Sequence, residues 1–143
     1  MSTLIDAPPT RVWDEVRKLE DHVDWMTDAV EITFTGPKLS GVGTTFDCET
    51  KVGPFRLTDH MEVTEWHEGR AIGVRHRGLV TGQGRFTITR ARRCRSRFTW
   101  DERLTFPWWM AGPVGGIGAK VVMRRIWKRN LRSLKARVES SRP

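Results

Sequence analysis

The chain has 143 residues, the length of one ordinary domain, and carries 25 Lys and Arg against 17 Asp and Glu, a formal net charge of +8. Hydrophobic residues make up 38% of it, with seven tryptophans and a mean hydropathy of -0.49, which argues against both a disordered chain and a membrane span. We therefore expect one soluble globular domain over residues 1–143.

The first residues, MSTLIDAPPTRVW, contain no basic segment followed by an apolar run. This predicts that there is no secretory signal and that the protein is cytoplasmic. Cys48 and Cys94 lie in no metal-ligand spacing, so we expect two ordinary thiols, no metal site and no cofactor.

The N-terminal part predicts a short strand followed by two small helices. Thr3 to Asp6 can form the strand, and an amphipathic helix follows the prolines at positions 8 and 9, with apolar residues at Val12, Trp13, Val16 and Leu19. The next segment, EDHVDWMTDAV, predicts a second short helix or helical turn that carries Trp25.

From Val30 the sequence alternates between apolar and polar residues, and the runs are separated by turns that contain Gly or Pro, except the last one at Ala91 to Arg93. No helical segment intervenes, which predicts an antiparallel meander. The six expected strands are Val30 to Thr35, Gly43 to Val52, Phe55 to Trp66, Arg70 to Arg77, Leu79 to Arg90 and Arg95 to Phe106.

The alternation assigns one face of each strand to the interior. That inner face is mostly apolar but contains three polar residues, Asp59, His76 and Glu102. Its other members are Phe46, Cys48, Thr50, Val52, Phe55, Leu57, Met61, Val63, Ile72, Val74, Gly84, Phe86, Ile88, Phe98, Trp100, Leu104 and Phe106.

The strongest helical pattern follows Gly118 and has a basic opposite face. Its apolar positions are Ala119, Val122, Met123, Ile126, Trp127, Leu131, Leu134 and Val138. Since a curved sheet must bury its apolar face, we expect this helix to cover it and to leave a space between the two. The fold class is α+β.

The same order of elements, together with several motifs, resembles the START-like or helix-grip (SRPBCC) superfamily and its polyketide cyclase/dehydrase-like group. The motifs are IDAPPTRVWDEV at Ile5 to Val16, Trp25, GVGTTF at Gly41 to Phe46, VTEW at Val63 to Trp66, and LKARVE near the end. The resemblance covers essentially the whole chain. It implies a helix-grip fold of about six or seven strands around the C-terminal helix, and a protein that binds or transforms a hydrophobic molecule.

The segment FPWWMAGPVGGIGAK, Phe106 to Lys120, is not a phosphate-binding loop. A Walker A loop would need glycine at Ile117, and a dinucleotide fingerprint would need glycine at Val121. We expect a Gly-rich helix start that forms the mouth of an apolar cavity, with Trp108 and Trp109 beside it; the alternative is a simple turn whose tryptophans cap the core.

Two functions remain open. The first is binding of a lipid, polyketide or aromatic metabolite, as a carrier or sensor, by a wall made of Trp13, Trp25, Phe46, Phe86, Trp100, Phe106, Trp108, Trp109, Ile117 and Met123. The second is a cyclase or dehydratase that uses Asp59, His76 and Glu102 as acid and base. The alternative is a structural role for these residues, because a buried carboxylate paired with a nearby arginine is more common than a catalytic one.

Positive charge gathers at Arg90 to Arg97 and on the outer face of the last helix. Neither stretch has the interleaved aromatic residues or recognition pattern of a nucleic-acid binder, so no specific nucleic-acid partner is expected. A basic solvated face or transient contact with an anionic membrane would fit this charge. The oligomeric state is left open.

Overall fold

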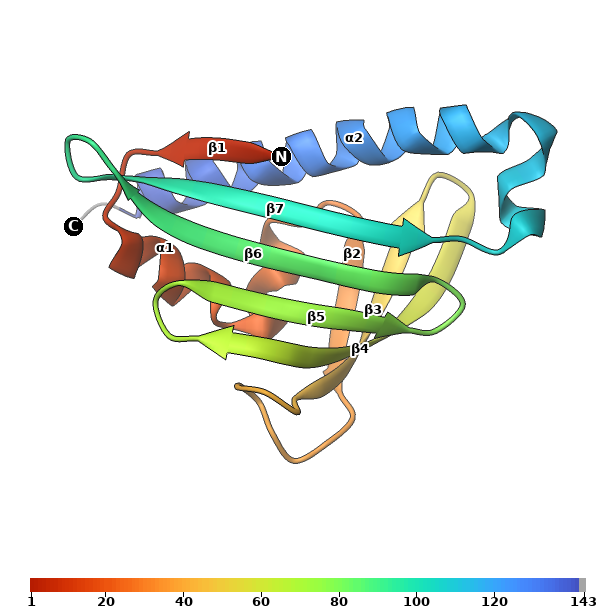
Figure 1. The fold of residues 1–143 in the computed structure, drawn as a ribbon, viewed down its shortest axis with the longest axis horizontal. Coiled ribbons are helices and arrows are strands. Elements are labelled where there is room, and N and C mark those ends of the chain that lie inside the picture. Colours follow the sequence, from red (N-terminus) through yellow and green to blue (C-terminus); the bar gives the residue numbers. More distant parts are fainter. Residues whose placement is uncertain (142–143) are drawn as a thin grey trace.

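The structure is a computed structural model that describes residues 1–141, and it describes their side chains except those of residues 110–117. The predicted α+β order of a strand, two short helices, a meander and a long helix is confirmed (Figure 1). The elements are β1 (Ser2–Ile5), α1 (Pro9–Val16), the 3-10 helix η1 (Leu19–Asp24), β2 (Ala29–Phe34), β3 (Thr45–Val52), β4 (Phe55–His67), β5 (Ala71–Arg77), β6 (Thr81–Ala91), β7 (Arg95–Thr105) and α2 (Trp108–Ser140).

All seven strands form one antiparallel sheet in the order β1-β7-β6-β5-β4-β3-β2. Each strand from β2 to β6 pairs with the next along the chain, so these strands form the predicted meander. The short first strand closes the other edge by pairing with β7, from Ser2 opposite Thr99 to Ile5 opposite Ser96.

The core lies between the concave side of the sheet, the two small helices and the second half of α2. Leu131, Leu134 and Val138 of α2 are buried there, together with Val12 and Val16 of α1. Figure 1 shows α2 running along β1 and β7. Burial of this apolar stripe is the main force that holds the helix on the sheet.

The first half of α2 differs from the sequence prediction in two ways. The helix begins at Trp108, just after the extended Pro107, so the expected helix start behind Gly118 is wrong. Glycine costs a helix only about 1 kcal/mol relative to alanine, which lowers helix stability without forbidding it. Val121 and Val122 are 46% and 44% exposed, so the helix at these two residues is not packed on the sheet as it is at Leu131 and Leu134.

Two smaller predictions also need correction. The second small helix ends at Asp24 and is a 3-10 helix, so residues 25–30 are not helical. Phe55, expected on the inner face, is 65% exposed because it stands at the tip of the β3–β4 hairpin, paired with Val52 across the turn. Among the described residues, no helix is long and apolar enough to cross a membrane.

Candidate functional site

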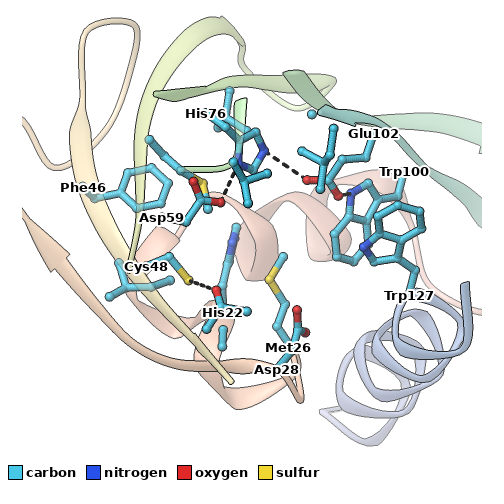
Figure 2. Close-up of a pocket in the computed structure, with 18 of the residues that line it drawn as sticks. His22, Met26, Asp28, Phe46, Cys48, Asp59, His76, Trp100, Glu102 and Trp127 are labelled. Carbon is cyan, nitrogen blue, oxygen red and sulfur yellow. Dashed lines mark hydrogen bonds and ion pairs between the residues drawn. The ribbon is translucent and has the colours of Figure 1, made fainter. Parts of the chain in front are cut away.

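A cavity of about 130 Å³ lies between the concave face of the sheet, η1 with the segment after it, and α2. Its wall is mostly apolar, and side chains from every strand of the meander contribute to it (Figure 2). Large contributors are Leu19, Phe46, Ile72, Phe86, Trp100 and Trp127. The expectation of a space between the sheet and the C-terminal helix is therefore met.

Three polar residues of the inner face meet on this wall: Asp59 of β4, His76 of β5 and Glu102 of β7. His76 Nδ1 lies 2.5 Å from Asp59 Oδ2, and His76 Nε2 lies 3.0 Å from Glu102 Oε1. Figure 2 shows the imidazole ring between the two carboxylates. Asp59 and His76 are buried, at 7% and 5% exposure.

The glycines of β6 explain how His76 and Glu102 can touch although a whole strand separates them. Gly84 pairs with Glu102 on one side and with Val74 on the other. A Cβ atom at Gly84 would lie 3.5 Å from Glu102 Oε1, which is an ordinary van der Waals contact. Glycine at this position therefore leaves the space beside the carboxylate open where it reaches over β6.

The cluster favours the protonated form of His76. Burial lowers the pKa of His76, but its contacts with Asp59 and Glu102 and their charges outweigh this effect and raise the pKa to about 9. The contact between His76 Nε2 and Glu102 is an ion pair, but its geometry does not meet that of a hydrogen bond. Glu102 is held from its other side by Trp100, whose indole N–H donates to Oε2 at 2.7 Å.

One oxygen of the cluster has no partner among the described residues. Asp59 Oδ1 is buried and accepts no hydrogen bond, while Oδ2 is occupied by His76. Leaving such an acceptor unpaired in a protein interior costs about 1–3 kcal/mol, so the wall keeps an unused capacity to accept a hydrogen bond.

A second histidine on the cavity wall was not predicted from the sequence. His22 of η1 is 5% exposed, and its Nε2 lies 2.7 Å from the carbonyl oxygen of Val16, which can only accept. Nε2 therefore carries the proton and Nδ1 carries the lone pair. Burial lowers the pKa of His22 to about 4, so the ring is neutral at physiological pH. The one feature of the sequence that could have pointed to His22 is its position three residues before Trp25, about one helical turn away.

Cys48 also lines the cavity, as its position on the inner face of the predicted strand indicates. Burial is the main cause that raises the pKa of the Cys48 thiol to about 12, and the Thr50 hydroxyl lies 3.8 Å from Sγ. A thiol with so high a pKa is not a nucleophile at neutral pH. In the described part of the chain, no group of three His, Cys, Asp or Glu side chains could hold a metal ion.

The predicted wall residues other than Trp108 and Trp109 fall into three groups. Phe46, Phe86, Trp100, Phe106 and Met123 line the cavity, as do Asp59, His76 and Glu102. Two others are buried without lining it: Trp25 packs behind the wall against Phe86 and Trp100, and Trp13 stacks edge-on against Trp66 and donates to Glu68. The predicted side chain of Ile117 lies outside the described residues.

The prediction that Trp108 and Trp109 flank the cavity is wrong. Their side chains are 86% and 59% exposed, and neither contributes to the wall. Because α2 begins at Trp108, the two residues stand on its exposed first turn, while Met123 and Trp127 reach the cavity from further along the helix. The chemistry of the site therefore lies on β4, β5, β7 and η1.

Comparisons with known proteins agree with this architecture. The family model described as "Polyketide cyclase / dehydrase and lipid transport" matches residues 1–139. No curated protein matches the sequence.

Solved structures share the fold at low sequence identity. A protein from Thermus thermophilus has a TM-score of 0.77 and 18% identity, covering 100% of this chain and 97% of its own. The Zhui aromatase/cyclase from a Streptomyces species has a TM-score of 0.72 and 15% identity, with 97% and 91% covered. A START superfamily protein from Mycobacterium smegmatis has a TM-score of 0.75 and 13% identity, with 98% and 95% covered. At these identities the likeness shows the fold alone.

Proposed function

Because this chain belongs to the polyketide cyclase/dehydrase and lipid-transport family of START-like proteins, we propose that it binds a hydrophobic small molecule in the cavity between its sheet and α2, as a carrier or sensor. The observation that carries the proposal is the interior space itself. An apolar space inside a close-packed protein forgoes packing energy that a ligand can restore.

The size of the cavity limits what it can enclose. A dry engineered cavity of roughly 150 Å³ binds benzene, so 130 Å³ accommodates about one ring. Of the ligand classes that the sequence leaves open, an aromatic metabolite or the ring of a polyketide fits this space directly. A long lipid chain would need the wall to open, and α2 is exposed at Val121 and Val122, next to the wall residue Met123.

An NMR titration with p-xylene tests the proposal. We expect the wild-type protein to bind this probe, with the largest shifts at cavity residues. Val74→Phe should abolish binding because Val74 lines the cavity and the larger ring fills it. Val121→Phe is the matched control, since Val121 is exposed on α2. Native mass spectrometry of the purified protein, with extraction of any bound compound, would then identify the natural ligand.

A second candidate is an enzyme of cyclase or dehydratase type, and the cluster of Asp59, His76 and Glu102 is the observation that favours it. Imidazolium between two carboxylates can give up a proton, and the unpaired Asp59 Oδ1 can accept one. Asp59→Asn and Glu102→Gln test it once a ligand is known. Turnover that falls by orders of magnitude while affinity is retained would support catalysis by the cluster. Unchanged turnover in both variants would show that the cluster is not the catalytic machinery, and a wild-type protein that binds the ligand without converting it would be a binding protein.

A further inference from the structure

The charge of the cavity wall is opposite to that of the whole chain. Three carboxylates line the cavity, those of Asp28, Asp59 and Glu102, against the single imidazolium of His76. The remaining cation among the described wall residues is Arg85, and its guanidinium is engaged outside the cavity. It donates to Glu65 at 2.7 and 2.8 Å and to the Thr87 hydroxyl at 3.2 Å.

Most hydrogen-bond donors on the wall are also committed to the protein. His76 Nε2 makes an ion pair with Glu102 without a well-aligned hydrogen bond, and the imidazolium is held between the two carboxylates. Trp100 donates to Glu102, His22 Nε2 donates to Val16, and the Thr50 hydroxyl is directed at Cys48 Sγ. The unpaired indole N–H of Trp25 lies in the core behind Phe86 and Trp100, outside the wall. Trp127 adds a neutral indole N–H, which does not offset a negative charge.

Acceptors, in contrast, remain available. Asp59 Oδ1 has no partner among the described residues, and His22 Nδ1 carries a lone pair because its other nitrogen holds the proton. Figure 2 shows His22 and Met26 reaching into the cavity from the side opposite His76, so the two acceptors belong to facing parts of the wall.

We propose that the cavity selects an apolar molecule whose polar group donates hydrogen bonds, a hydroxyl or an amine, and rejects an anion of the same shape. This inference rests on the proposed function and adds the chemical class of the ligand. A hydroxyl that donates to an ionised carboxylate makes a charge-assisted hydrogen bond, which is about twice as strong as a neutral one. A ligand carboxylate would lose its hydration and meet further carboxylates with no free cation to compensate it.

Two probes of nearly equal shape, p-cresol and p-xylene, and one larger anion, 4-methylbenzoate, test the selectivity when each is titrated separately into the wild-type protein at neutral pH. We expect p-cresol to bind about tenfold more tightly than p-xylene, and 4-methylbenzoate to bind more weakly than either. If 4-methylbenzoate binds as tightly as p-cresol, or p-cresol no more tightly than p-xylene, the inference is overturned while the proposed function stands. If none of the three binds, the proposed function itself fails.

Asp59→Asn assigns the selectivity to the cluster, with Asp101→Asn as the control, because Asp101 is exposed on β7. Removing the buried negative charge should lower the preference for p-cresol over 4-methylbenzoate by about tenfold or more, and the control should keep it. Glu102→Gln provides a second variant should Asp59→Asn not fold. An unchanged preference in the folded variants would show that the cluster does not set the ligand class.

Discussion

His76 should make the stability of this protein decrease as the pH rises above neutral. Its pKa is about 9 in the folded protein, against an ordinary value of 6.5, because contacts with Asp59 and Glu102 outweigh the effect of burial. The folded state therefore holds this proton more tightly than the unfolded chain does. The resulting stabilisation is complete below pH 6.5 and is lost as the pH rises through 9, and it amounts to about 3 kcal/mol.

Urea unfolding at about pH 6, 7.5 and 9.5 would measure this effect. We expect the free energy of unfolding of the wild type, relative to that of His76→Gln, to fall by up to about 3 kcal/mol across the range. His60→Gln is the control: His60 also lies 2.5 Å from an aspartate, Asp47, but its side chain is 57% exposed. A difference between wild type and His76→Gln that stays level or grows with pH would refute the reasoning.

Thiol reactivity, helix packing and membrane contact give three further tests. A thiol reagent should label the exposed Cys94 at once and the buried Cys48, whose pKa burial raises, only after unfolding. Leu134→Ala should cost about 2–5 kcal/mol of unfolding free energy in a urea titration, because Leu134 is fully buried. Contact with anionic membrane stays a prediction: replacing the exposed Trp108 and Trp109 by alanine should reduce sedimentation with phosphatidylserine vesicles, and equal sedimentation would contradict it.

Which residues of each strand face the interior could be predicted, because the alternation has a period of two and all turns but the last contain glycine or proline. A one-residue error would have moved Asp59, His76 and Glu102 to the outer face, so their common location on the wall depended on this phase. Their mutual contact was not predictable from alternation. It depends on the register of the four neighbouring strands β4 to β7, which is not visible within one strand.

The tryptophans show where a general rule about burial fails. Large aromatic residues are usually buried, and Trp13, Trp25 and Trp100 are buried, but of these three predicted wall residues Trp100 alone lines the cavity. The same rule fails for Trp108 and Trp109, because their place depends on where α2 begins. Glycines in the following segment suggested a turn, yet the helix runs through them, and its first turn extends beyond the packed part of the sheet.

The net charge of +8 describes the outer surface of this protein and carries no information about its interior. Most of the cations are exposed side chains, such as Arg124 and Arg132 on the outer side of α2, whereas Asp59 and Glu102 are turned inward by strand alternation. Because buried charges act through a lower effective dielectric than exposed ones, the few carboxylates of the wall govern what the cavity accepts. A ligand steered by the surface would be anionic, whereas the ligand that the cavity favours is a hydrogen-bond donor, and the two need not be the same molecule.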